Sequence, residues 1–557
     1  MPAGSSNRSQ ETPDFYGTYP RLSDAQIREL EQHGHRHDTT VGEVLFAAGE
    51  TECDLVVVLE GLVAVVDHYG TSEERIIAQH GPGRFVGEMG MLTGQAMFLT
   101  AVVQDPGQVL RVPYEGLRDA VAVDPDLGDL ILRALLQRRS LHLGLETGLR
   151  ILGSRYSEDT RRLRDFAARN LLPHRYVDLE EDKQADALLS QLGVRPDETP
   201  VVILGGSRVL RNPTIADLAR ELGLRPAKKP TDLCDLVVVG AGPAGLAAAV
   251  YAASEGLNTV ILDSVAPGGQ AARTSRIENY LGFPAGISGA ELAERAVVQA
   301  RKFGATMTVP AEATGLEEEA GFHRVACDGD SVIARTLLIS TGASHRRLDV
   351  PGVSEFGGCV YYAATESEAQ LCRNDDDVVV LGGGNSAGQA AVFLAQRRPS
   401  VRLVLSPSDL ATNMSRYLAD RIEHTPSIEV HRESTVRRLL GSMHRLEQVE
   451  VENLRTRRRD KLPAQSLFVF IGTTPHTGWL RGQLDVDDDG FVLTGVQLVD
   501  PYRVDRDRRP KMLETSRPGV FAAGDVRSGS VKRMGAAVGE GALAVRLVHE
   551  YLAEAGR

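Results

Sequence analysis

Cysteine is scarce in this sequence: its 557 residues include five, an odd number. Five widely spaced thiols cannot form the dense disulfide framework of a small secreted protein. The N-terminus, MPAGSSNRSQETPDFYG, lacks a basic start followed by an apolar stretch, so no secretory signal is predicted. Together these features predict a cytoplasmic protein.

Basic charge is also in short supply, with 62 Lys and Arg against 75 Asp and Glu, a net charge of −13. General nucleic-acid binders carry a basic face, so the composition argues against that class. We expect the one basic run, RTRRRDK at 455–461, to be a solvated turn. The longest uncharged run, 236–253, contains GAGPAG and fits a buried strand, turn and helix better than a membrane span. No nucleic-acid or membrane partner is predicted.

The length predicts about three to five domains. Short apolar strands and glycine turns predict a small β-barrel or jelly roll over 42–50, 54–67, 79–94 and 107–113. Helical periodicity follows over 114–145. Residues 150–224 read as strand and helix in alternation (β-α-β-α-β-α), which predicts a small α/β domain, and 227–232 (AKKPTD) reads as a linker.

The strongest motif is LVVVGAGPAGLAAAVYAASEGLNTVILD, residues 236–263. Its first glycine permits a tight turn, the second lets the backbone approach a pyrophosphate, and the third allows close helix–strand packing. The acid that ends the second strand can accept hydrogen bonds from ribose hydroxyls. The cofactor-binding residues predicted here are Gly240, Gly242, Pro243, Ala244, Gly245 and Asp263.

A second unit, VVVLGGGNSAGQAAVFLAQRRPSVRLVLS at 378–406, repeats the pattern. Its helix N-terminus, where amide dipoles favour phosphate, carries polar residues. The predicted binding residues are Gly382, Gly384, Asn385 and Ser386. Two such units and a third signature, FAAGD at 521–525, predict a flavoprotein with two dinucleotide cofactors, FAD and NAD(P)H.

Residues 233–557 resemble the low-molecular-weight thioredoxin reductases. The resemblance is carried by both glycine turns and by GGQ (268–270), RIENYLGFP (276–284), STGAS (340–344), IGTTPHTGWL (471–480), GVFAAGD (519–525) and GAAVGEGALAV (535–545). It implies an FAD domain at 233–350 and 471–557, split around an NAD(P)-binding domain at 351–470, and a homodimer. It also implies FAD contacts from Gly269, Gln270, Asn279, Gly524, Asp525 and Arg533, with 532–534 near the flavin pyrimidine ring.

One departure from that family concerns sulfur. Thioredoxin reductases carry Cys-Ala-Thr-Cys after a tyrosine, whereas this chain has Tyr362-Ala363-Ala364-Thr365-Glu366. A disulfide relay needs two thiols, and neither Ala363 nor Glu366 supplies one. Cys359 and Cys372 lie nearby in sequence, and a redox role for them stays open beside the plainer reading of buried thiols. Glu366 is a candidate proton donor to reduced flavin, from its position alone.

The nicotinamide preference is a second departure. The stretch after the second strand of this unit, Leu405-Ser406-Pro407-Ser408-Asp409, offers no arginine fork for a 2′-phosphate and no acid in register for a 2′-hydroxyl. Three arginines elsewhere are candidates to compensate, namely Arg397, Arg402 and Arg416. The sequence therefore leaves NADH and NADPH both open.

The two N-terminal units also carry resemblances. Residues 18–145 resemble a cyclic-nucleotide-binding domain, with GRFVGEMGMLTG (83–94) as its phosphate cassette. The resemblance implies that Gly87 and Glu88 contact a cyclic nucleotide, but 95–101 (QAMFLTA) lacks the arginine that would pair its phosphate. Binding of cyclic AMP is therefore disfavoured, and a barrel retained for packing or dimerisation is the expected outcome.

Residues 148–226 resemble a glutaredoxin or thioredoxin fold, with Ser157 and Thr160 in the two sulfur positions and Thr199-Pro200 where that family has its cis-proline. Neither hydroxyl can exchange disulfides, so an adaptor without redox activity is predicted. For the whole chain we predict an FAD-dependent NAD(P)H oxidoreductase that passes electrons to a partner protein or small-molecule acceptor. The alternative is a flavin-containing sensor without turnover, and no helix-turn-helix of a transcription factor is read after the barrel.

Overall fold

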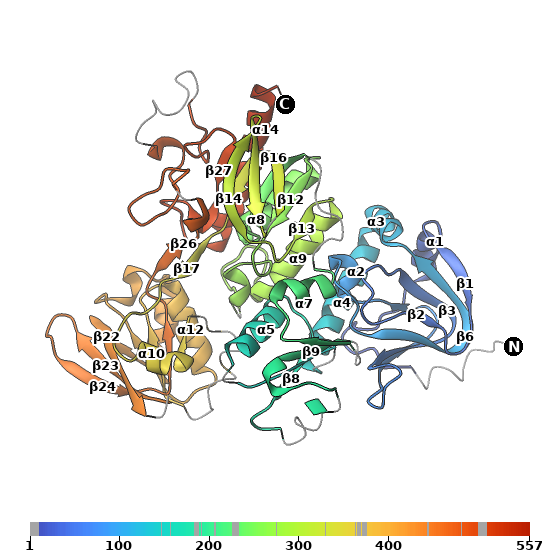
Figure 1. Cartoon of the computed structure of the whole chain (residues 1–557), viewed down its shortest axis with the longest axis horizontal. Coiled ribbons are helices and arrows are strands. Elements are labelled where there is room, and N and C mark those ends of the chain that lie inside the picture. The colour runs from blue at the N-terminus through green and yellow to red at the C-terminus, as the bar shows by residue number, and fades with distance from the viewer. Residues whose placement is uncertain are drawn as a thin grey trace.

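The computed structural model shows a multidomain chain in which the barrel and the middle unit precede two dinucleotide units, the second inserted into the first (Figure 1). Its described part comprises residues 11–145, 148–155, 157–182, 189–190, 192–204, 208–224, 233–274, 276–328, 330–362, 364, 369, 376–442, 445–480, 482–498 and 509–556. No helix in these ranges is both long and apolar enough to cross a membrane.

The N-terminal unit is a β-rich barrel around one buried apolar core. The long strands β3 and β6 pair antiparallel along its centre, in the order β1-β6-β3-β4, with β2 on β6 and β5 on β3. Its elements are α1 (Asp24–Glu31), β1 (His35–Thr39), β2 (Val44–Phe46), β3 (Leu55–Asp67), β4 (Arg75–His80), β5 (Phe85–Val86), α2 (Met89–Thr93), β6 (Thr100–Val112), α3 (Tyr114–Val123) and α4 (Pro125–Gly144).

The region of predicted helical periodicity, 114–145, forms two helices, α3 and α4. Asp124 adopts an extended backbone between α3 and α4, and its carboxylate accepts hydrogen bonds from the amides of Asp126 and Leu127. An aspartate N-cap followed by proline at the first helical position starts a new helix.

The middle unit (residues 149–224) is a four-stranded mixed sheet in the order β10-β9-β7-β8. Ser157 caps α5, and the Thr199–Pro200 peptide bond is cis, as the resemblance implied. Strand β10 is a correction: RVLR was not predicted as a strand, because it is short and its side chains are not buried. The helix predicted near 185–193 lies mostly outside the described residues. The elements are β7 (Leu149–Gly153), α5 (Glu158–Arg169), β8 (His174–Asp178), η2 (Pro196–Glu198), β9 (Val201–Leu204), β10 (Arg208–Arg211) and α7 (Ile215–Glu221).

The first dinucleotide unit has a seven-stranded sheet, ordered β13-β12-β11-β16-β15-β14, with β27 beside β16. Strands β13, β12, β11, β16 and β27 run parallel, and alanine-rich α8 packs closely on α14 and α9. The elements are β11 (Cys234–Val239), α8 (Pro243–Ser254), β12 (Thr259–Leu262), η3 (Ala271–Arg273), α9 (Gly289–Lys302), β13 (Thr306–Thr308), β14 (Ala313–Glu319), β15 (Phe322–Cys327), β16 (Asp330–Ile339), η6 (Gly478–Leu480), η7 (Gly495–Gln497), β27 (Val520–Ala522), η8 (Gly524–Val526) and α14 (Met534–Glu554).

The second dinucleotide unit is inserted between β16 and β27, and the short strands β17 (Ala343–His345) and β26 (Thr473–Pro475) pair where the chain enters and leaves it. Its parallel sheet runs β18-β25-β19-β20-β21, beside the antiparallel sheet β22-β23-β24. The elements are α10 (Val353–Phe356), η4 (Gly357–Cys359), β18 (Val360–Tyr361), β19 (Val378–Leu381), α12 (Asn385–Ala395), β20 (Val401–Val404), η5 (Leu410–Thr412), α13 (Arg416–Glu423), β21 (Ile428–His431), β22 (Ser434–Ser442), β23 (Arg445–Asn453), β24 (Arg459–Pro463) and β25 (Ser466–Val469).

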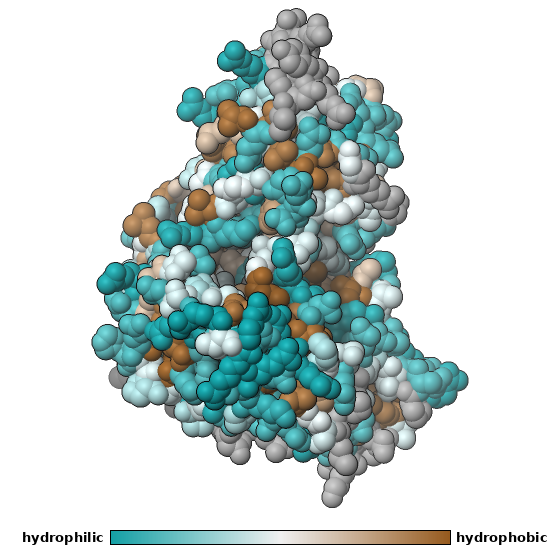
Figure 2. Space-filling model, turned by 90° about the vertical axis from the view of Figure 1, so that its left-hand side faces the viewer, coloured by the Kyte–Doolittle hydropathy of each residue, from teal (hydrophilic) through white to brown (hydrophobic). Residues whose placement is uncertain are grey.

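The basic run at 455–461 spans the β23–β24 turn and the first residues of β24, and it is exposed. Hydrophilic side chains dominate the face of the molecule that this unit presents (Figure 2). Its arginines pair with acids: Arg457 with Glu452 at 3.0 Å and Arg459 with Glu450 at 2.9 Å. These pairs neutralise the run, which supports the interpretation as a solvated turn.

Candidate active site

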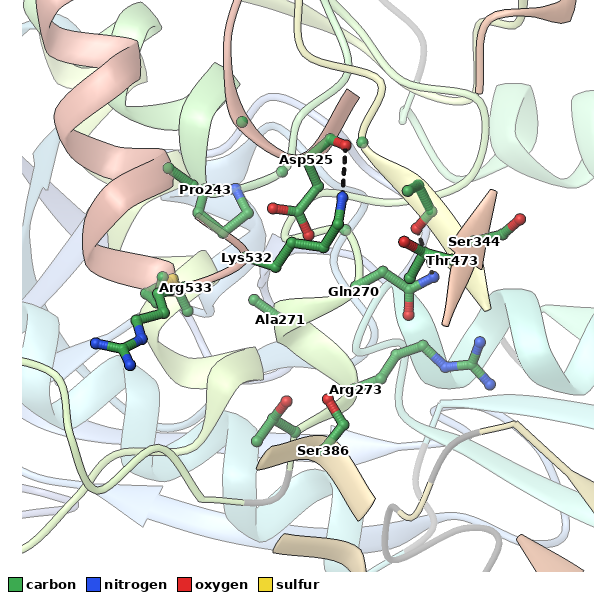
Figure 3. Close-up of a pocket in the computed structure, with 18 of the residues that line it drawn as sticks. Pro243, Gln270, Ala271, Arg273, Ser344, Ser386, Thr473, Asp525, Lys532 and Arg533 are labelled. Carbon is green, nitrogen blue, oxygen red and sulfur yellow. Dashed lines mark hydrogen bonds between the residues drawn. The ribbon is translucent and has the colours of Figure 1, made fainter. Parts of the chain in front are cut away.

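One continuous cavity of about 1280 Å³ lies between the two dinucleotide units. Ordinary small-molecule pockets occupy roughly 300–1,000 Å³, so this space suits a larger ligand or two ligands together. The walls come from the glycine turn before α8, the loop after β12, η3, the N-terminus of α12 and the N-terminus of α14 (Figure 3). Both predicted dinucleotide turns therefore border the same space.

The first turn is built for a phosphate. Gly242 is the N-cap of α8 and has no side chain to satisfy the first amides of the helix, so these amides remain available to an anion. Asp263 follows β12, and its carboxylate accepts hydrogen bonds from the amides of Ala241 (2.8 Å), Val265 (3.0 Å) and Ala266 (3.0 Å). Burial raises the pKa of Asp263 and these amides lower it. The acid thus fixes the turn and also lines the cavity.

The second turn has the same design. Gly384 caps α12 without a side-chain hydrogen bond, and Asn385 and Ser386 line the cavity. The Oδ1 atom of Asn385 accepts a hydrogen bond from the Ser415 amide at 2.8 Å, which ties α12 to the start of α13. Ser386 faces the same space as Gln270 and Arg273 of the first unit (Figure 3).

Charged groups gather at the end of the cavity formed by α14. The Lys532 ammonium donates to the Asp525 carbonyl at 3.2 Å and lies 4.2 Å from the ring centroid of Phe491. Burial raises the pKa of the Asp525 carboxyl and lowers the pKa of Lys532. Gln270 donates from Nε2 to the Ala343 carbonyl at 3.3 Å (Figure 3).

The structure brings most predicted binding residues together. Those that line the cavity are Gly240, Gly242, Pro243, Ala244, Asp263, Gly269, Gln270, Asn279, Asn385, Ser386, Gly524, Asp525 and Arg533. Gly245, Gly382 and Gly384 do not line it; they shape the turns behind it. Contact of any of these residues with a cofactor stays a prediction.

Several wall residues were not predicted. Trp479 belongs to the IGTTPHTGWL motif that marks the family resemblance and Arg273 lies between two such motifs, but no spacing rule singles either of them out. Arg169 also lines the cavity, although it comes from α5 of the middle unit. No local pattern could indicate that contact, because it depends on how the units pack.

The cavity wall carries helix N-termini that can bind anions. Three helices begin at its wall, namely α8, α12 and α14, and none of them has a side-chain cap on its N-terminal amides. Ser157, Thr214 and Ser288 cap helices α5, α7 and α9, whereas α3 and α13 also lack a side-chain cap. Uncapped helix N-termini attract phosphate. The residues present therefore fit two dinucleotides.

Only one of the three arginines considered for nicotinamide selection borders this cavity. Arg397 lines it, with its guanidinium 4.2 Å from the centroid of the Phe393 ring. Arg402 pairs with Asp377 at 2.7 Å, and Arg416 lies 3.8 Å from Asp420. Arg397 is thus the remaining candidate of the three, and the preference for NADH or NADPH stays open.

No cysteine lies in the described wall of the cavity. Ala364 lines it, whereas Ala363, Glu366 and Cys372 lie outside the described residues. The four cysteines that the structure describes do not line the cavity: Cys53, Cys234, Cys327 and Cys359. Burial raises the pKa of Cys234 to about 12, which disfavours its thiolate.

In the phosphate cassette of the barrel, the carboxylate of Glu88 is hydrogen-bonded to the backbone of the same domain. Both Glu88 oxygens accept backbone amides, from Phe98 at 3.1 Å and from Leu99 at 2.9 Å. Met97, in the stretch that lacks an arginine, is 1% exposed and belongs to the core. Burial raises the pKa of Glu88 to about 7. These contacts support the prediction that cyclic AMP is not bound, and that prediction remains untested.

Comparison with known proteins places these units. Residues 39–124 match the cyclic nucleotide-binding domain, and residues 234–541 match the pyridine nucleotide-disulphide oxidoreductases. The chain is 31% identical over 327 residues to the 34.2 kDa protein in rubredoxin operon of Clostridium pasteurianum (57% of this chain, 97% of the relative). It is 31% identical over 365 residues to NADPH-dependent thioredoxin reductase 3 of Arabidopsis thaliana (62% of this chain, 66% of the relative).

The crystal structure of Lactococcus lactis thioredoxin reductase superposes with a TM-score of 0.52 at 28% identity, over 58% of this chain and 99% of that one. The matches confirm the predicted fold class, with a cyclic-nucleotide-binding unit ahead of a reductase with two dinucleotide-binding units. They also confirm an FAD- and NAD(P)H-dependent oxidoreductase. The chain belongs to the pyridine nucleotide-disulphide oxidoreductase family.

Proposed function

We propose that this protein oxidises NAD(P)H through FAD and passes the electrons from flavin directly to a partner protein or small-molecule acceptor, without a disulfide relay of its own. The observation that carries the proposal is that both dinucleotide turns border one cavity. The residues that line the cavity would hold FAD, which would supply the chemistry of hydride acceptance and electron donation. Hydride transfer needs the two rings in contact, which a shared cavity permits.

The residues divide the work of binding. The amides at the start of α8 would hold the FAD pyrophosphate, and Asp263 lies where the ribose hydroxyls of the adenylate half would be. Asp525 and Lys532, at the opposite end, would hold the ribityl and ring portion. The amides at the start of α12 would hold the nicotinamide cofactor. Trp479 and Phe470 supply aromatic wall that excludes water.

The proposed route for the electrons follows from the sulfur chemistry. A relay needs two thiols that reach both flavin and acceptor, one of them as thiolate. The positions that hold them in thioredoxin reductases are Ala363 and Glu366 here, and no described cysteine borders the cavity. Direct transfer from flavin is the route that these residues support.

The first test is reduction of the bound flavin without oxygen. The full chain is expected to purify yellow and to lose its flavin absorbance when NADH or NADPH is mixed with it in an anaerobic stopped-flow instrument. The faster cofactor gives the preference. Flavin that dithionite bleaches but neither nicotinamide bleaches would contradict turnover and would favour the sensor alternative.

The second test uses thioredoxin as acceptor. With either nicotinamide cofactor, the chain is expected to reduce an ordinary thioredoxin no faster than a blank without it, because the relay thiols are missing. The double variant Ala363→Cys/Glu366→Cys is the matched comparison and is expected to gain activity. Robust reduction by the unmodified chain, lost in Cys359→Ser or Cys372→Ser, would show instead that these cysteines replace the pair.

A further inference from the structure

Among the described residues of the middle unit, Arg169 is the one that lines the cavity. Arg169, the last residue of α5, lines the wall beside Asp263, Ser264 and Val265 of the loop that follows β12. The ion pair that its guanidinium makes within its own helix is long: Nη1 lies 3.9 Å from Oδ2 of Asp165, an exposed carboxylate. Such a pair contributes little, so the cation is available to a ligand in the cavity.

Asp263 does not need Arg169 as a hydrogen-bond partner. The Asp263 carboxylate already accepts three amides, from Ala241, Val265 and Ala266. Burial lowers the pKa of Arg169, an effect to which Arg273 adds and which Asp165 and Asp263 oppose. A phosphate is the ligand that would relieve this cost, because a guanidinium binds phosphate oxygens in bidentate fashion.

The position of Arg169 is fixed by its two neighbours in sequence. Asn170 is 5% exposed, and its Nδ2 donates to the Val265 carbonyl at 3.0 Å, which bridges the middle unit to the loop after Asp263. The Oδ1 atom of Asn170 is buried and has no hydrogen-bond partner. Leu171 has a φ of 52°, and its carbonyl accepts from Nε of Arg139 at 3.1 Å.

Arg139 extends this junction to the other two units. It lies on α4 of the barrel, donates to Oε1 of Gln95 after the cassette helix, and pairs with Glu294 of α9 at 2.6 Å. Both side chains of this pair are buried, at 6% and 8% exposure. A buried pair of this kind needs both partners in place. Through Arg139 and Asn170, the barrel, the middle unit and the first dinucleotide unit therefore contact one another next to residues 169–171.

We propose that the middle unit completes the FAD site, with Arg169 binding the adenylate half of FAD from outside the reductase fold. This inference rests on the proposed function only in requiring that FAD occupies the cavity. In the middle unit, Ser157 and Thr160 stand where the glutaredoxin and thioredoxin folds have their active cysteines. The inference gives this unit the role of retaining the cofactor in place of disulfide exchange.

The test compares Arg169→Ala and Arg169→Lys with Arg161→Ala, an exposed arginine on the same helix that does not border the cavity. FAD release from the full chain after dilution is followed by the rise in flavin fluorescence, and ADP binding is titrated on the deflavinated full chain. Loss of one charge-assisted contact corresponds to about a ten-fold change. Arg169→Ala is therefore expected to release FAD about ten-fold faster and to bind ADP about ten-fold more weakly than the unmodified chain. Arg169→Lys is expected to lie between the two.

The melting temperature of the deflavinated chain separates binding from folding. We expect Arg169→Ala and Arg161→Ala to melt together without FAD. Equal FAD release and ADP affinity in these two variants would overturn the inference, and so would a loss accompanied by lower melting of the deflavinated Arg169→Ala chain. An unmodified chain that takes up no FAD would instead contradict the proposed function.

Discussion

Replacing Gly245 with alanine is expected to yield a protein that purifies without FAD. A Cβ atom at this position would lie 1.9 Å from the Gly240 carbonyl oxygen and 2.6 Å from Oγ of Ser340. The first of these is backbone, so helix α8 must move away from the turn by more than an ångström. That shift opens the amide cradle that would hold the pyrophosphate, and it costs about 3 kcal/mol of folding free energy. The ratio of flavin to protein after purification measures the effect.

A matched control separates this effect from glycine replacement in general. Gly539→Ala changes an exposed position of α14 where an added Cβ meets nothing within 4 Å. We expect it to keep its flavin and to melt at or slightly above the temperature of the unmodified chain, because alanine favours a helix over glycine. A yellow Gly245→Ala protein with unchanged FAD affinity would contradict the role of this turn in holding FAD.

The glycine turns could be predicted from sequence because their geometry is local. Each strand, turn and helix lies within thirty residues, and the spacing of the glycines reports directly on which backbone atoms approach one another. The structure accordingly places Gly242 and Gly384 as the two N-caps of α8 and α12. The same locality explains why the serine cap of α5 at Ser157 was predictable.

Features that depend on packing were not predictable in the same way. The break at Asp124 lies inside a pattern with helical periodicity, and only the side-chain cap and the following proline favour two helices over one. Strand β10 has four residues and no buried side chain, so its pairing with β9 gives no hydrophobic signal. Arg169 reaches the cavity only because Asn170 and Leu171 are held by two other units. Long-range contacts of this kind leave no periodic trace in the chain.

The position of the two turns on one cavity allows FAD binding and reduction by a nicotinamide cofactor to be tested separately. Under the proposed function, the first turn would retain FAD and the second would bind the nicotinamide cofactor that reduces it. Because both border one space, a change at the second turn should leave a protein that is yellow and inactive. Such a protein would discriminate an oxidoreductase from a sensor that needs only its flavin.

Gly382→Ala is expected to produce this state. Gly382 has a φ of 147°, which an alanine rarely adopts, and its added Cβ would lie 2.4 Å from the Phe470 carbonyl oxygen and 3.1 Å from the Ala387 Cβ. The turn must therefore rearrange, and the amides at the start of α12 would no longer point toward the phosphates of the nicotinamide cofactor. We expect flavin content to stay near one per chain while anaerobic reduction by NADH or NADPH slows by about a hundred-fold, the size of effect that a misplacement of about 1 Å produces.

Dithionite is expected to bleach the Gly382→Ala flavin normally, because it reduces flavin without a binding site. Gly358→Ala, an exposed position in the same unit where an added Cβ meets nothing within 4 Å, is the matched control and should be reduced at the unmodified rate. If Gly382→Ala were reduced as fast as this control, the second turn would have no part in hydride transfer, and the nicotinamide would have to approach the flavin from another wall of the cavity. A loss of FAD in Gly382→Ala would show instead that the two turns form one cooperative unit, because the flavin half would then depend on a glycine that does not line its space.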